Sequence, residues 1–506
     1  MRIYERVNRI FSHPHPLKLP RYDMPVSAAA LDKIFSDCTD YQSREILVGG
    51  DRSGKVSVCY LDGVVDSSAL SEDVIRPLTD STRISGSVGS AHCMDLIKKG
   101  AVYCNSVSVK ESMDEVVEAV VKGFSVIIFD KEQAALAFET RSGVQRSISE
   151  PTMEKAVKGA KDAFVERLRT NTMLVRRKLR TPELKILKSI VGRRSDTEVA
   201  ILYVDGIANP VTVGEVLHRL NDIDIDGLLA TGNIVEYISD SPASPFPQTL
   251  LTERPDRFAM NMLEGRVGII IDGLPLAVMV PGTFSEIMRV PEDRAQHYLT
   301  ASFLRLLRYI AVFITVLFPA LYVATAMYHQ EMIPLKLLIS IIESKQQVPF
   351  STAIEIIGML VAFELLQEAG LRLPNSVGET VSIIGALIVG QSAVEAKVIS
   401  PIAVIVVAVA GVTGYTVPNQ DLGAALRLCR FMMVFFALLA GMFGIIAGLV
   451  LLVYHLCTLE SFGVSYLSPL TDGNALGVFS MILRPPLDKS KLRQPEMNTP
   501  NIRNQR

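Results

Sequence analysis

The sequence predicts a soluble α/β half built of two similar modules, followed by an α-helical transmembrane domain. Apolar runs typical of strands alternate with helix-like periodic stretches up to about residue 284, and long uncharged apolar segments begin after residue 302. The mean hydropathy is +0.31 although 21% of the residues are charged, which is typical of a soluble part joined to a membrane part.

The two soluble modules are expected at 46–149 and 199–284. In each, an apolar strand runs into an Asp-Gly turn and then a helix, and the two aspartates, Asp62 and Asp205, lie 143 positions apart (205 − 62). A strand, turn and strand follow in both, with Asp130 and Asp272 at the turns, 142 apart (272 − 130). A nearly constant offset indicates duplication, although strands joined by Asp-Gly turns are also common independently of any repeat.

The remaining soluble segments are assigned by composition. Residues 1–45 form an N-terminal segment, 285–301 a charged linker and 459–506 a polar C-terminal tail. Residues 150–198 are strongly basic and are predicted to form a helical connector with an exposed arm. This connector is either a solvated linker face or a contact with acidic lipid headgroups or a neighbouring subunit.

The transmembrane domain is expected at 302–458. Three segments are apolar enough to cross the membrane: 309–327, 398–417 and 431–454. Two further segments, 351–374 and 378–396, are ambiguous. Arg305 and Arg308 precede the first crossing and the tail is basic, so both ends are expected on the inside. An even number of crossings is then required. We predict about four, with one ambiguous segment forming a broken or interfacial helix.

Polar residues in the ambiguous segments are the candidate pore or gating residues: Glu355, Glu364, Glu368, Gln391 and Glu395. Helical spacing places Glu364 with Glu368 on one face, Gln391 with Glu395 on another, and Glu355 opposite Glu364. Carboxylates at membrane depth are costly, so they face protein or water. They either line a hydrated path that favours cations, or lie in the headgroup region where acids are ordinary.

Other function classes find little support in the sequence. The formal net charge is −2 and no long basic run occurs, so no nucleic-acid partner is predicted. The six cysteines form no CxxC motif or zinc-type set, so neither a metal nor a cofactor is predicted. The stretch GGDRSGKV at 49–56 nearly matches a phosphate-binding loop, but it connects two strands and ends in valine instead of a hydroxyl residue. We therefore predict no enzyme activity.

Several stretches together resemble a known family. They are EPTMEKAVKGAKDAFVERLRTNTMLVRRKL, SPFPQ, TERPD, PFSTAIE, FELLQEAGLRLP, VGETVSIIGALIVGQSAVEAKVISP and YTVPNQDLGAALRLCRF. This pattern resembles the A-subunit family of bacterial spore germination receptors (GerA type), which includes the stage V sporulation protein AF. The resemblance extends from about residue 146 to residue 470.

The resemblance implies a multi-pass protein of the spore inner membrane, a cell membrane, with a cytoplasmic N-terminal domain. It implies a homo-oligomer embedded in membrane lipid that forms a cation channel and releases monovalent cations when germination is triggered. The implied partners are a transporter-like B subunit that senses nutrients and a C-subunit lipoprotein. The alternative is a non-conducting scaffold or accessory subunit, similar to the stage V protein AF. Leu360 and Gln367 depart from the family pattern, which puts the charge pattern of a pore in doubt.

Between the second module and the membrane lies a proline-rich and charged stretch. Proline fixes φ and removes a backbone donor, so this stretch is expected to be a stiff joint. We expect it to act as a coupling collar that transmits movement of the soluble half to the first crossing helix. Its candidate residues are Pro245, Pro247, Glu253, Arg254, Pro255 and Asp256.

Overall fold

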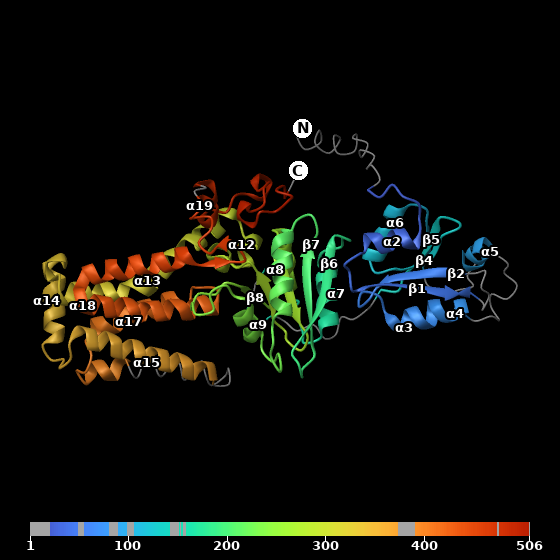
Figure 1. Ribbon diagram of the computed structural model, residues 1–506. Helices are drawn as coiled ribbons and strands as arrows, with labels where there is room; N and C mark the ends of the chain where they lie inside the picture. Colours follow the sequence, from blue (N-terminus) through green and yellow to red (C-terminus); the bar gives the residue numbers. More distant parts are fainter. Residues whose placement is uncertain are drawn as a thin grey trace, which may run out of the picture.

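A computed structural model describes residues 21–48, 55–79, 90–98, 106–141, 151, 153–154, 158–372, 390–472 and 475–504. Two five-stranded β-sheets and a group of helices follow one another along the molecule, and the second of these sheets lies between the first and the helices (Figure 1). The soluble α/β half with two sheets is therefore as predicted. The turn at 49–54 and most of the ambiguous segment 378–396 lie outside the described residues.

The first module is an antiparallel sheet covered on both faces by helices. Its strands have the order β1 (Tyr41–Leu47), β2 (Lys55–Leu61), β4 (Ser125–Phe129), β5 (Ala134–Phe138) and β3 (Val107–Lys110). Alternate strand side chains enter two separate cores. One core is closed by α2 (Ala28–Ile34) and α6 (Met113–Val121). The other is closed by η2 (Leu70–Ile75), which directly follows the short helix α3 (Ser67–Ala69), and by α4 (Arg76–Thr79) and α5 (Ser90–Leu96).

The second module repeats this topology. Its strands have the order β6 (Leu184–Val191), β7 (Thr197–Val204), β9 (Val267–Ile271), β10 (Ala277–Val280) and β8 (Leu250–Thr252). One face is covered by α8 (Pro210–Asn221) and α9 (Thr231–Ile238), the other by α7 (Leu168–Lys178) and α10 (Pro255–Leu263). The strand order matches that of the first sheet position by position. The predicted repeat is therefore present in the topology.

The basic connector differs from its prediction as a helical segment with an exposed arm. Helix α7 is largely buried, and residues 184–191 form β6, which pairs with β7 along its whole length. The helical prediction was wrong here because the local pattern of LKILKSIV does not alternate strictly, and pairing with β7 selects the strand. Residues 34–40 lie beside β6: Lys185 donates to the carbonyl oxygens of Ile34 and Ser36, at 3.0 and 2.7 Å.

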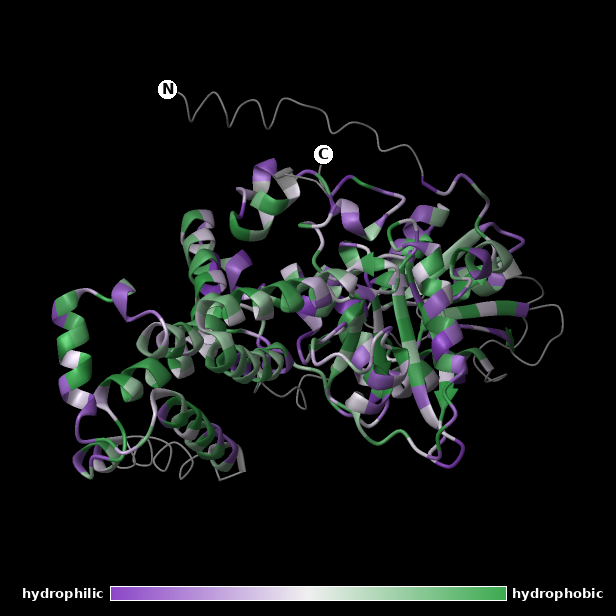
Figure 2. Cartoon of the chain, turned by 60° about the vertical axis from the view of Figure 1, so that its left-hand side comes forward, coloured by the Kyte–Doolittle hydropathy of each residue, from purple (hydrophilic) through white to green (hydrophobic). Residues whose placement is uncertain are grey.

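In the described part of the C-terminal helical domain, the long elements are α13 (Tyr298–Met327), α14 (Leu335–Lys345), α15 (Thr352–Arg372), α17 (Pro401–Gly414) and α18 (Gln420–Thr458). Among the described residues, α13 and α18 are long and apolar enough to cross a membrane, while α17 has only 14 residues. The four predicted crossings are thus not established. Figure 2 shows that apolar residues recur along these helices. Several of their large side chains are exposed: Phe313 is 60% and Phe443 75% exposed.

Helix α18 is not one straight rod but a hairpin of two arms. Ala440 (φ −144°, ψ 21°) and Gly441 (φ 56°, ψ −132°) leave the helical conformation, and only the second of these has the positive φ that favours glycine. Gly448 packs against Met433 and Phe436, which a straight helix would place about 18–22 Å away. The stretch 431–454, predicted as a single crossing, therefore divides between two antiparallel arms. A local apolar pattern cannot show this reversal.

Close approach of the two arms makes Gly444 intolerant of a side chain. A Cβ atom there would lie 1.9 Å from the carbonyl oxygen of Phe436, whereas a Cβ at Gly423 in the first arm meets nothing within 4 Å. We expect Gly444→Ala to destabilise the protein by about 1–3 kcal/mol, since a packed backbone cannot move away at low cost. Gly423→Ala is the matched control and should be neutral or slightly stabilising. Thermal unfolding of both variants in detergent distinguishes them, and equal melting temperatures would contradict the hairpin packing.

Candidate functional site

Glu355 is buried inside the subunit and does not face open water. Its side chain comes from the first turn of α15, and the residue is 2% exposed. Oε2 accepts a hydrogen bond from the backbone N–H of Ser400 at 3.0 Å, and Oε1 lies 3.3 Å from Nζ of Lys345. The carboxylate therefore joins the end of α14, the start of α15 and the N-terminus of α17, where the helix dipole favours a negative charge.

Glu364 is compensated by two arginines of the first α18 arm. Arg430, whose side chain is 1% exposed, donates to Oε1 of Glu364, and Nε of Arg427 lies 3.5 Å from Oε2. Sequence reasoning missed both arginines. The available signal was their position three residues apart beside an apolar segment, because intramembrane charges normally have a partner of opposite sign.

The other three candidate pore residues are exposed in this subunit. Glu368 lies one turn beyond Glu364 on α15, as predicted, and its side chain is on the surface. Gln391 donates from Nε2 to Oε1 of Glu395 at 3.2 Å, so this predicted same-face pair is in contact. Glu355 is thus buried and Glu364 partly buried, whereas Glu368 and Glu395 are exposed.

Four of the six collar candidates act within the second module. Oε1 of Glu253 accepts from the backbone N–H groups of Met153 and Glu154, at 2.6 and 2.7 Å. Arg254 is 1% exposed and forms a bidentate ion pair with Asp256, at 3.1 and 2.8 Å. Pro255 begins α10, where its missing N–H costs nothing. These residues fix the chain that enters the module, and the structure does not place them against the first membrane helix.

Pro245 and Pro247 belong to a segment, 244–248, that contacts the end of α18. Ser244 Oγ lies 2.9 Å from Nε2 of His455, and the rings of Phe246 and His455 are 6.0 Å apart. The carbonyl oxygen of Gln248 accepts from Oγ of Ser461, in the short strand β11 (Glu460–Ser461) that follows the helix, at 2.7 Å. The proline-rich segment therefore meets the second α18 arm, whereas the sequence predicted a connection to α13.

The connection to α13 is made by Asp293, in the short helix α12 (Glu292–Ala295). This residue is 1% exposed and accepts hydrogen bonds from Arg305 and Arg308, both at 2.9 Å. Burial alone would raise the pKa of Asp293, but Arg308 and Arg305 hold that pKa below its usual value. Arg484 of the tail donates to the carbonyl oxygens of Asp293 and Gln296, each at 2.7 Å. Buried charges thus anchor linker, helix and tail together.

Fold and site define a membrane protein in which a duplicated α/β region is joined to apolar helices through buried charged contacts. Residues 29–496 match the family model described as Bacillus/Clostridium GerA spore germination protein, and the chain belongs to this family.

The similar proteins include spore germination proteins and an uncharacterized membrane protein. Spore germination protein KA of Bacillus subtilis is 36% identical over 90% of this chain and 84% of its own length. Spore germination protein GerLA of Bacillus cereus is 34% identical over 85% of this chain and 87% of its length. An uncharacterized membrane protein of Bacillus subtilis, YfkQ, is 36% identical over 89% of this chain and 86% of its own length. A crystal structure of the N-terminal domain of the A subunit of the Bacillus megaterium spore germinant receptor GerK3 covers 51% of this chain and 93% of that chain, at 30% identity and a TM-score of 0.40.

Proposed function

We propose that this chain is the A-type subunit of a spore germination receptor, and that copies of it assemble around a path for monovalent cations. Membership of the family supports the receptor role. The observation that carries the conduction role is the exposed carboxylate of Glu368, on a membrane-domain helix whose neighbouring surface is apolar, with Leu365 66% and Val361 44% exposed. An acid beside such a surface is stabilised when neighbouring subunits cover the apolar residues and leave the carboxylate facing water.

Assembly would also place the exposed pair Gln391 and Glu395 near the same path. In this proposal the soluble modules lie in the cytoplasm of the spore and the helices cross its inner membrane several times. Arg305 and Arg308 at the sheet-proximal end of α13 support this orientation. A transporter-like B subunit would sense the nutrient and a C-subunit lipoprotein would complete the receptor. Segment 244–248, against His455, would transmit movement of the modules to α18.

One observation favours the alternative, a non-conducting scaffold or accessory subunit. Glu355 and Glu364 both have cationic partners within the subunit, so these two carboxylates are accounted for by folding alone. A scaffold needs such ion pairs and does not need an exposed carboxylate. The exposed acids therefore distinguish the two functions.

The test is cation flux through the purified full-length protein in liposomes, alone and with its partner subunits. We expect Glu368→Gln to lower potassium flux by up to about tenfold, because a ring of carboxylates concentrates counter-ions at a pore. Glu236→Gln, on the exposed surface of α9, removes the same charge far from the membrane domain and should leave the flux unchanged. Absence of flux from correctly assembled wild-type protein would support the scaffold.

A further inference from the structure

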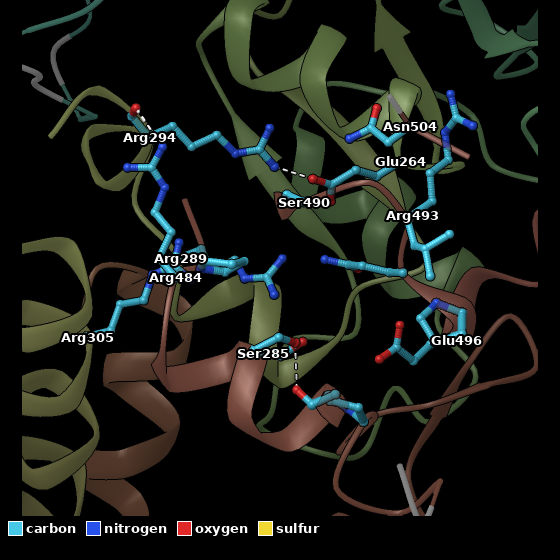
Figure 3. Close-up of a pocket in the computed structure, with 17 residues that line it drawn as sticks. Glu264, Ser285, Arg289, Arg294, Arg305, Arg484, Ser490, Arg493, Glu496 and Asn504 are labelled. Atoms are coloured by element: carbon cyan, nitrogen blue, oxygen red, sulfur yellow. Dashed lines mark hydrogen bonds and ion pairs between the residues drawn. The ribbon is translucent and has the colours of Figure 1, made fainter. Parts of the chain in front are cut away.

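A cavity of about 220 Å³ lies where the second module, the start of α13 and the C-terminal tail meet. The tail closes it with α19 (Ala475–Ile482) and residues 484–504, and Figure 3 shows charged side chains entering from opposite sides. Arg289, Arg305 and Arg484 lie on one side, and Arg493 and Glu496 on the other. The channel proposal assigns no role to this cavity.

Its lining is strongly cationic. Five arginines and only two glutamates, Glu264 and Glu496, contribute to the wall. Three of the arginines have a carboxylate partner: Arg289 pairs with Glu286, Arg294 with Glu264, and Arg305 with Asp293. The other two arginines of the wall are Arg484 and Arg493.

Arg484 and Arg493 form no ion pair with a carboxylate within the described residues. Within the described part of the chain, Arg484 donates to three backbone carbonyl oxygens of residues 293–296, and Arg493 donates to the carbonyl oxygens of Leu263, Asn501 and Arg503. Neither has a carboxylate among these contacts. The buried Nε of Arg289 also lacks a hydrogen-bond partner there. A buried cationic donor without an acceptor is costly, so an anion in the cavity would be stabilised.

The electrostatics of the wall agree with this excess of positive charge. Burial lowers the pKa of Arg484, and the nearby Arg294 lowers this pKa further. Burial raises the pKa of Glu496, whose Oε2 has no partner within the described residues.

The cavity lies at the level expected for lipid headgroups. Arg305 precedes the apolar stretch that begins at Tyr309 by four residues, which is about 6 Å along a helix. The polar region on each side of the hydrocarbon core is about 5–7 Å thick. Lipid phosphates and small anions dissolved in the cytoplasm can both reach this depth.

We propose that this cavity binds a phosphate group, supplied either by an anionic lipid or by a small soluble phosphate compound. Guanidinium groups match phosphate oxygens in charge and in fork geometry, and they approach this cavity from the linker, α13 and the tail. A phosphate held between Arg289 and Arg493 would fasten the tail to the membrane junction. The inference does not depend on ion conduction.

The test measures hydrogen exchange of tail residues 477–504 in the full-length protein. One arm adds inorganic phosphate to protein in detergent, with chloride at equal ionic strength as the reference. The second arm compares nanodiscs of phosphatidylglycerol with nanodiscs of phosphatidylcholine. A ligand at ten times its Kd should slow exchange of the tail by about tenfold, since closed and bound states are linked by mass action.

Arg493→Gln and Arg289→Gln should each abolish most of this protection, and Arg493→Lys should retain part of it. Arg194→Gln is the matched control, because its side chain is 83% exposed on the second module and the same charge is removed. Protection by inorganic phosphate identifies a soluble anion, and protection only by phosphatidylglycerol identifies a lipid headgroup. If neither ligand slows exchange in the wild-type protein, or if the variants keep full protection, the proposal is wrong. Should Arg493→Gln fail to fold, Arg289→Gln and Arg493→Lys still decide the question.

Discussion

Replacing Arg176 with alanine is expected to lower the free energy of unfolding by about 3–5 kcal/mol. Arg176 lies on α7 of the second module, and its side chain is 1% exposed. Nε and Nη2 donate to the two carboxylate oxygens of Asp40, at 2.7 and 2.8 Å, and Nη1 donates to the carbonyl oxygen of Thr181 at 3.2 Å. Asp40 precedes β1 of the first module. Its side chain is only 10% exposed, so the substitution leaves a buried carboxylate without its cation.

Arg169 provides the control within the same helix. It also bridges the modules, through Asp62, but the two side chains are 49% and 40% exposed. An exposed ion pair contributes about 0–1 kcal/mol, so Arg169→Ala should have a small effect. Thermal unfolding of the full-length protein, followed by circular dichroism, compares the two variants. Similar losses for both would show that the buried bidentate pair does not hold the modules together.

The organisation of the soluble half could be predicted because its strands and turns are each recognisable from a short stretch of sequence. Apolar runs with a period of two specify strands, and Asp62 and Asp205 mark equivalent turns whatever the rest of the chain does. Strand β6 was missed because its two lysines, Lys185 and Lys188, made a basic helix an equally good local description. Pairing with β7, which is not visible in the sequence of β6 itself, decides between the two.

The membrane domain depends on contacts between residues distant in sequence. Nothing in the apolar stretch 431–454 marks the reversal at Gly441 except the glycine itself, and that stretch contains other glycines that remain helical. The collar residues were predicted to couple the second module to the first crossing helix, but the sequence could not show which elements they contact. Segment 244–248 contacts His455, more than two hundred residues further along the chain. Composition indicates a joint, while the identity of the two joined elements requires the fold.

The same reasoning applies to the charged residues at membrane depth. The sequence alone shows acids on apolar helices and therefore favours a water-filled path. The structure shows that Lys345 and Arg430 neutralise two of these acids within the subunit. A carboxylate that forms an ion pair contributes to folding stability, whereas one that lines a pore contributes to conduction. Measuring the stability of single variants can therefore show which acids form ion pairs.

Arg430→Gln is expected to destabilise the protein by about 2–4 kcal/mol, because it removes the buried partner of Glu364. The double variant Arg430→Gln with Glu364→Gln should be more stable than the sum of the two single losses predicts. We expect a coupling energy of about 1–3 kcal/mol between the two sites. Arg427→Gln is the matched control: this side chain is 31% exposed and lies 3.5 Å from Glu364, so its coupling should be weaker. Thermal unfolding in detergent of the wild type, the three single variants and the two double variants with Glu364→Gln gives both coupling energies.

The cycle also bears on function. Strong coupling would identify Glu364 as an ion-pair residue that holds α15 against the first α18 arm. Glu364→Gln should then lower the free energy of unfolding and leave potassium flux little changed. Additive losses would mean that Glu364 does not depend on Arg430 in the membrane. In that case the carboxylate is available to cations, and the conduction path would extend from Glu368 one helical turn further along α15.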